Sequence, residues 1–140
     1  MSLIRIDNLE IRKVTEDILL IHQIKAPYLF SCCDGLLILP KEGRNKFTIS
    51  LDLNIEPKYI KIINDKFGPV SNYVCTHAHV DHTSHVHAWE ESGTIIHAPQ
   101  PEAEFLLDLQ KFYRGFSKLA RVSMEKVMYF LEFSFLIKEK

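Results

Sequence analysis

The sequence predicts an α+β fold in which helices cover one face of a mixed β-sheet. Two observations support this prediction. Residues 9–51 form a series of short, β-branched and partly alternating runs, which is typical of a meander of strands. From residue 56 onward, helix-like apolar spacing alternates with short strand-like segments. Strands that come first and then alternate with helices predict a sheet covered by helices.

The strand-like segments share β-branched or wholly apolar composition between turn residues, and they are residues 9–14, 17–24, 35–39, 46–51, 70–75 and 94–97. Residues 26–31 are a further candidate strand. The polar connection at residues 40–45 contains Pro40 and Gly43, so the segments on either side of it are expected to form a hairpin.

Helical spacing is found in three segments. Residues 56–67 end before Gly68, and residues 82–91 end before Gly93. Residues 101–116 carry an apolar stripe that we interpret as core and that consists of Phe105, Leu109, Phe112 and Phe116. Residues 118–140 are expected to be a helical or irregular tail, because residues 124–136 are apolar nearly all round and periodicity does not distinguish a buried helix from a strand there.

Composition is that of a globular, cytoplasmic protein. Apolar residues make up 46% and charged residues 25% of the 140 residues, and the net charge of −1 gives no support to a nucleic-acid or membrane partner. The start of the chain is charged too early for a signal peptide, and its longest apolar stretch is too short to span a bilayer. Three cysteines form no disulfide framework. We expect Cys75 in the core, and Cys32 and Cys33 at apolar sheet positions rather than as a reactive pair.

The segment from Thr76 to His82 is rich in side chains that bind metal ions, and those side chains are His77, His79, Asp81 and His82. His77 and His79 are two residues apart, so in an extended segment they leave the same side of the chain and can bind one ion together. Asp81 and His82 follow where the chain turns into a helix and can point toward a neighbouring site, although Asp81 could instead cap that helix. Imidazole and carboxylate ligands suit zinc, with manganese or iron possible.

Residues 72–83 resemble the signature of the metallo-β-lactamase superfamily. Residues 94–98 after the following helix fit the same pattern, and residues 50–54 resemble the Asp-Thr-Gly turn of the family. Asn54 stands where glycine is usual, and asparagine tolerates a positive φ better than most residues. The resemblance covers residues 11–116. It implies an αββα sandwich of which about one half is present, with residues 1–117 as the N-terminal part of the domain.

The resemblance also implies roles for single residues. His77 and His79 would bind a first zinc ion, and Asp81 and His82 a second, with Asp81 also orienting the nucleophile. Asp52 would help to hold the metal-binding loop without binding metal itself. In the complete family site, a metal-bound hydroxide attacks an ester, thioester, amide or phosphoester of a small-molecule substrate.

Two departures from the family pattern matter. Ser84 and His85 replace a pair of glycines, and His85 could substitute for a missing ligand, although a packing role is more common for such a histidine. No histidine follows His97, so the later ligands of the family are not in this sequence. The alternative to a hydrolase is therefore a truncated, inactive half-domain that binds metal weakly. In either case we expect a homo-oligomer joined through the exposed sheet face, with the aromatic residues of the tail in the contact: Tyr129, Phe130, Phe133 and Phe135.

Overall fold

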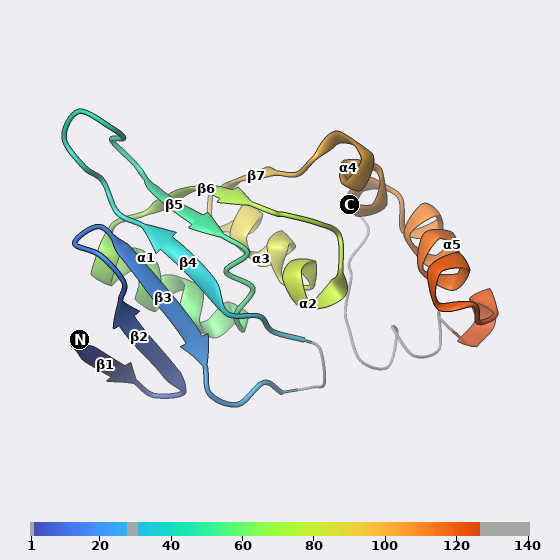
Figure 1. Ribbon diagram of the computed structural model, residues 1–140, viewed down its shortest axis with the longest axis horizontal. Helices are drawn as coiled ribbons and strands as arrows, with labels where there is room; N and C mark the ends of the chain where they lie inside the picture. The colour runs from blue at the N-terminus through green and yellow to red at the C-terminus, as the bar shows by residue number, and fades with distance from the viewer. Residues whose placement is uncertain (1, 28–30, 127–140) are drawn as a thin grey trace.

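The computed structural model describes residues 2–27 and 31–126 of the chain. Seven strands form one sheet in which spatial order follows chain order (Figure 1). The strands are β1 (Leu3–Ile6), β2 (Leu9–Lys13), β3 (Ile18–Gln23), β4 (Gly35–Ile38), β5 (Thr48–Leu51), β6 (Val70–Val74) and β7 (Ile95–His97). The α+β prediction is confirmed, and the strand missing from it is β1, a four-residue strand that pairs antiparallel with β2.

The sheet changes from antiparallel to parallel at β5. Strands β1 to β5 pair antiparallel through short connections, whereas β5, β6 and β7 pair in parallel. Parallel neighbours need a crossover, and helices supply both of them. The first crossover contains the 3₁₀ turn η1 (Pro57–Tyr59) and α1 (Ile60–Phe67), and the second contains α2 (Val80–Thr83) and α3 (Val86–Glu91). This arrangement brings the ends of β5 and β6 to the same edge of the sheet.

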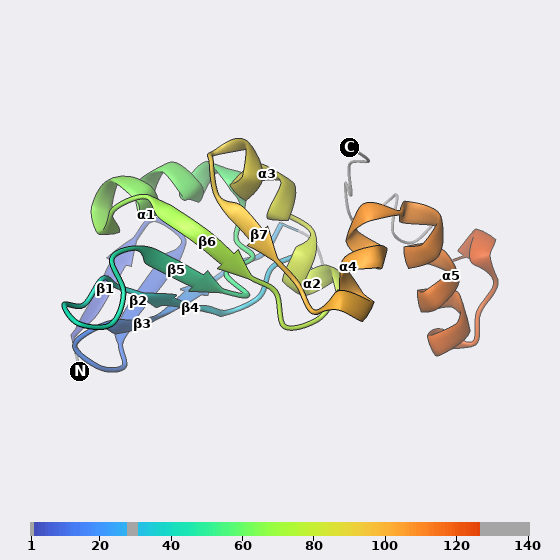
Figure 2. The ribbon, with the colours of Figure 1, turned by 90° about the horizontal axis from the view of Figure 1, so that it is seen from above.

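The crossover helices α1 and α3 lie on one face of the sheet, as the view in Figure 2 shows. The core forms between this face and the helices. It contains fully buried side chains from the strands, such as Ile21, Leu37 and Tyr73, and from the helices, such as Ile63 and Trp89. Burial of these side chains is the main stabilising contribution to the fold. The prediction that helices cover one face is confirmed.

The opposite face of the sheet is also apolar. Leu20, Leu36, Leu51 and Val74 are consecutive partners across β3, β4, β5 and β6, so they form one row. All four are half-buried. In Figure 2 no labelled helix lies over the face of the sheet opposite α1 and α3. Alternation along each strand places this row on the face that points away from α1.

The two later helical segments are each divided in two. Residues 82–91 are broken at Ser84 and His85, because the backbone N–H of His85 donates to the Asn54 side chain instead of continuing the helix. Residues 101–116 are broken at Asp108, whose extended backbone separates α4 (Gln100–Leu107) from α5 (Leu109–Ala120) and whose carboxylate caps α5.

Helices α4 and α5 extend beyond the sheet rather than covering it (Figures 1 and 2). The apolar stripe predicted as core therefore does not pack on the sheet. Phe112 is buried and Phe105 is half-buried. Both line a cavity of about 250 Å³ together with His77, Ala78 and His79. The boundary predicted after residue 117 lies inside α5. The predicted roles of the aromatic residues in the tail lie outside the described residues.

The loop between β3 and β4 contains the vicinal cysteines. Their predicted sheet positions are wrong, because Cys32 and Cys33 precede the first residue of β4 and pair with no strand. Cys75 is buried, as expected. Residues 28–30, in the candidate strand at residues 26–31, lie outside the described residues. Within the described part of the chain, every helix is too short or too polar to cross a bilayer.

Candidate metal centre

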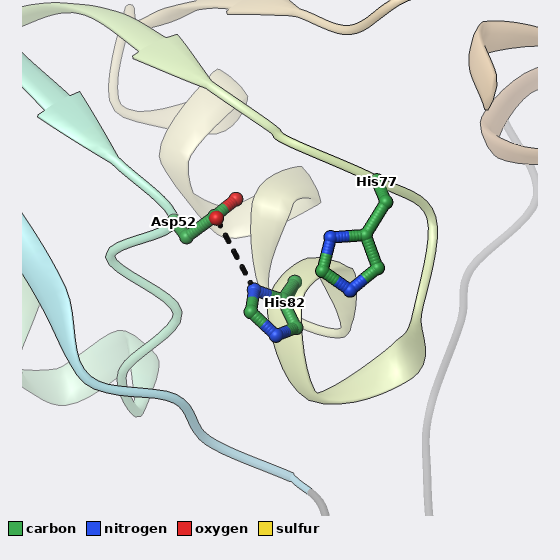
Figure 3. A group of neighbouring side chains, drawn as sticks. All are labelled: Asp52, His77 and His82. Carbon is green, nitrogen blue, oxygen red and sulfur yellow. Dashed lines mark ion pairs between the residues drawn. The ribbon is translucent and has the colours of Figure 1, made fainter.

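Three side chains that can bind metal meet at the edge of the sheet where β5 and β6 end. Asp52 follows β5 directly, His77 lies three residues beyond β6, and His82 comes from α2 (Figure 3). One donor atom from each lies within 4.8 Å of the other two. Because parallel strands end at a common edge, the chain brings Asp52 and the His77–His82 loop together without a long excursion.

The Asp52 carboxylate is the buried part of this cluster. Its Oδ2 lies 3.3 Å from Nδ1 of His82, and the rings of His82 and His77 are 4.2 Å apart between centroids. Asp52 is only 7% exposed. A carboxylate this deep needs a positive group or several donors around it, and His82 and Thr76 lie within contact of it.

Thr76 holds Asp52 and His77 in place. Its backbone N–H donates to Oδ1 of Asp52 at 2.9 Å, and its hydroxyl donates to Oδ2 at 2.6 Å. The same hydroxyl lies 2.7 Å from Nδ1 of His77. One threonine thus orients both the carboxylate and the neighbouring imidazole. Asp52 itself adopts a positive φ of 47°, which aims its side chain back across the end of β6 toward this loop.

Asn54 joins the segments that surround the cluster. It is fully buried, and its amide donates to the backbone oxygens of Ser31 and Asp81 and to the hydroxyl of Ser84. The expectation that Asn54 takes the positive φ of a glycine is wrong, since Asp52 does so instead. Asparagine is needed at this position for its hydrogen bonds, because its amide satisfies buried backbone groups that glycine would leave unpaired.

The structure places the remaining predicted ligands at different distances from the cluster. The ring of His79 is exposed and packs edge-on against His77, with centroids 4.5 Å apart, but it is not one of the three converging donors. Asp81 is half-buried, and its Oδ2 lies 3.6 Å from Nε2 of His82. His85 is directed to the backbone of Ser31, and burial lowers the pKa of its imidazole.

The His77–Ala78–His79 segment is also held from the side of α4. Glu102 accepts a hydrogen bond from the backbone N–H of Ala78 at 2.9 Å. On the opposite side, the hydroxyl of buried Tyr73 donates to the backbone oxygen of His82 at 2.8 Å. Both ends of the loop between Thr76 and α2 are therefore fixed before any ion binds, which lowers the ordering cost of binding.

Sequence reasoning missed Cys33 as a neighbour of the cluster. Its Sγ lies 3.5 Å from Nδ1 and 3.7 Å from Nε2 of His82. Burial, followed by the charges of Asp81, Asp52 and Asp34, raises the pKa of the Cys33 thiol to about 12. No local pattern predicts this contact, because the two residues are 49 positions apart.

The donors present fit a zinc ion. Two imidazoles and a carboxylate are ordinary zinc ligands, and bonds of about 2.0–2.2 Å place the donor atoms of a tetrahedral site roughly 3.4 Å apart. The 3.3 Å between Asp52 Oδ2 and His82 Nδ1 already has this value. The donor nitrogen of His77 lies within 4.8 Å of the donor atoms of Asp52 and His82. A small movement of the His77 side chain would therefore complete the site.

Comparison with known proteins supports the fold. The structure is similar to the crystal structure of a metallo-β-lactamase from Erythrobacter litoralis, with a TM-score of 0.55, 17% sequence identity, and coverage of 74% of this chain and 45% of that one. No protein-family model matches the chain, and no curated protein sequence does. The chain thus has an α+β fold similar to part of a metallo-β-lactamase, spans less than half the length of that neighbour, and carries a group of Asp and His side chains that could hold a metal ion.

Proposed function

We propose that this chain binds a divalent metal ion, zinc first among the candidates, between Asp52, His77 and His82. The observation that carries the proposal is the convergence of these three donors from separate segments at one edge of the sheet. His79 packs against His77, and Asp81 lies beside His82. The similarity of the fold to a metallo-β-lactamase supports the same proposal.

We further propose that the complete protein is a metal-dependent hydrolase of an ester, thioester, amide or phosphoester. A divalent ion would polarise the scissile carbonyl or phosphoryl group and make a water molecule more acidic. The chain's own part is positioning: Thr76 orients Asp52 and His77. The side chains of Tyr73, Glu102 and Asn54 hydrogen-bond to the backbone of the loop and keep it in one conformation. Asp81, which lies beside His82, would orient the nucleophile.

Metal analysis tests the binding proposal. After loading with zinc and removal of the excess, wild type should retain zinc, but less than the two ions of the complete family site. The double variant His77→Ala/His82→Ala should lose it, whereas His22→Ala/His97→Ala, which removes two histidines from outside the cluster, should not. Equal zinc in wild type and the first variant would refute the assignment. His79→Ala distinguishes binding by Asp52, His77 and His82 from binding by His77 and His79. The observed geometry predicts that His79→Ala loses less zinc than His82→Ala.

Turnover tests the catalytic proposal. The chain alone should hydrolyse generic esters and phosphodiesters slowly, because the ligands that the family adds later in its sequence are not among its residues. The slow turnover should disappear with EDTA and return with zinc. Fast turnover that survives EDTA would contradict a metal-dependent reaction.

A second candidate function is a catalytically inactive half-domain that binds metal weakly and associates through its sheet. The apolar row of Leu20, Leu36, Leu51 and Val74 on the uncovered face favours this candidate. The two candidates differ in turnover: the half-domain predicts none above the background of free zinc, even when the metal site is full.

A further inference from the structure

The cavity of about 250 Å³ between the His77–His79 segment and the helices α4 and α5 adjoins the candidate metal centre. His77, Ala78 and His79 line it, and His77 is also one of the three converging donors. A molecule in the cavity therefore contacts a residue that would bind the ion. The proposed function has so far left this cavity without a role.

The helical wall of the cavity is apolar. It is formed by Phe105 of α4 and by Phe112 and Leu119 of α5. Phe112 is buried, whereas Leu119 is 70% exposed, so the apolar lining runs from the interior to the surface of the protein. Such a wall stabilises an apolar group that leaves water and gives no hydrogen bonds to a hydrated one.

Two small residues keep the space of the cavity free. Ala78 lines it from the loop, and Gly115 lines it from the middle of α5. Glycine is unfavourable inside a helix, so its presence there calls for a packing reason. A Cβ at position 115 would lie 3.0 Å from the ring of Phe105. Gly115 therefore allows Phe105 to pack close to α5 while the cavity stays empty of side chains.

Charge around the cavity favours an uncharged occupant. Among the described residues that line it, none is a lysine or arginine, and Glu102 is acidic. Glu102 accepts a hydrogen bond from the backbone N–H of Ala78, which keeps its carboxylate at the cavity wall. A phosphate group at this position would face a carboxylate and lack the cationic partners that usually bind it.

We propose that this cavity binds the acyl group of the substrate, and that the substrates are carboxylic esters, thioesters or amides of an apolar acid. This inference rests on the proposed function and excludes the phosphoesters from it. A cavity of roughly 150 Å³ holds a benzene molecule, so the larger volume here corresponds to an acyl group of about six to ten carbon atoms. In the reaction, water adds its hydroxyl group to the acyl carbon, the bond to the leaving oxygen, sulfur or nitrogen breaks, and the leaving group takes the remaining proton.

Binding of product analogues tests the proposal without requiring turnover. Acetate and hexanoate are titrated into the zinc-loaded full chain and followed by nuclear magnetic resonance. Hexanoate has four more CH₂ groups, and burial of each strengthens binding about fourfold, so we expect hexanoate to bind at least about tenfold more tightly than acetate.

Variants of α5 locate the binding site of the hexanoate chain. Gly115→Leu places a side chain in the cavity and should remove the preference for hexanoate. Gln110→Leu adds the same side chain at an exposed position of α5 that does not line the cavity, and it should keep the preference. Leu119→Gln makes the exposed end of the cavity polar without disturbing the buried wall, and it should reduce the preference. Zinc content and circular dichroism are measured for every variant.

The outcomes distinguish this inference from the proposed function. Equal affinities for acetate and hexanoate in zinc-loaded wild type, or a preference that survives in both Gly115→Leu and Leu119→Gln, would overturn the acyl cavity and leave metal binding intact. Hexanoate affinity that stays the same after zinc is removed with EDTA would also overturn it, because the carboxylate would then not reach the metal centre. Failure of folded wild type to retain zinc would overturn both proposals. A zinc-dependent preference that Gly115→Leu removes and Gln110→Leu keeps would support both.

Discussion

The side-chain amide of Asn54 donates a hydrogen bond to the backbone oxygen of Asp81 at 2.6 Å. The contact joins the turn after β5 to the first turn of α2. The same side chain accepts from the backbone N–H of His85 at 2.8 Å, at the point where α2 stops and before α3 begins. One buried asparagine thus sets both the position of the His77–His82 loop and the break in the crossover helix.

Replacing Asn54 with leucine, which is close in size but cannot hydrogen-bond, should destabilise the fold strongly. Each buried partner left unpaired costs about 1–3 kcal/mol, so we expect the free energy of unfolding to fall by about 3 kcal/mol or more. Urea denaturation measures this loss. Asn8→Ala is the control, because the Asn8 side chain bonds the backbone of Lys25 at an exposed position and its loss should cost less than about 1 kcal/mol. Equal effects in the two variants would contradict the role of Asn54.

Gly35→Ala should displace the turn that carries Asp52. A Cβ at this position would lie 2.4 Å from Cα of Leu53 and 2.8 Å from the backbone oxygen of Asp52, and backbone atoms cannot move aside singly. We expect a stability loss of about 2 kcal/mol, as for other overpacked sites, together with weaker zinc binding measured by titration. In Gly115→Ala, the control within α5, the new methyl would meet only the ring of Phe105, which can rotate. Unchanged zinc affinity in a folded Gly35→Ala would show that the close approach does not position Asp52.

His85 should make the metal-free protein less stable in mild acid. Burial lowers the pKa of His85 from its ordinary value of 6.5, so the unfolded chain takes up a proton more readily than the folded one. The contribution of His85 to stability is therefore fully present above pH 6.5 and is lost as the pH falls through the lower pKa of the folded state. Urea denaturation with EDTA at several pH values measures this slope. His85→Gln should flatten it, and an unchanged slope in a folded His85→Gln would contradict this prediction.

Self-association through the sheet remains a prediction, now with a defined surface. The row of Leu20, Leu36, Leu51 and Val74 lies on the face away from α1, and burying it against another copy would remove apolar area from water. Light scattering at micromolar concentration should detect a dimer or larger species, and Leu36→Glu should shift it toward the monomer. Leu107→Glu changes an 82% exposed leucine on α4 and serves as the control. A wild-type monomer at every concentration would refute this prediction.

The sequence by itself determined the type and order of most elements and the loop that carries the candidate ligands His77 and His82. Strand and helix periods are local, so residues 9–51 could be interpreted as a meander and residues 56–67 as a crossover helix. The spacing of His77 and His82 between a strand and a helix was local as well. The helix breaks at His85 and Asp108 were not predictable in this way, because the apolar pattern continues through both. At His85 the backbone N–H donates to the distant Asn54 side chain, and at Asp108 the backbone is extended and the carboxylate caps α5.

Only the tertiary structure decided which side chains meet. Asp52 reaches Thr76 across 24 positions of sequence, and Cys33 reaches His82 across 49. Such contacts depend on the parallel pairing of β5 with β6 and on the close approach at Gly35. No local sequence pattern reveals either of them. The positive φ at Asp52 rather than at Asn54 has the same origin, because the buried partners of Asn54 come from two other segments, the loop before β4 and the end of α2. The sequence therefore determined that side chains able to bind metal were present, and packing of the sheet against its crossovers determined how they are arranged.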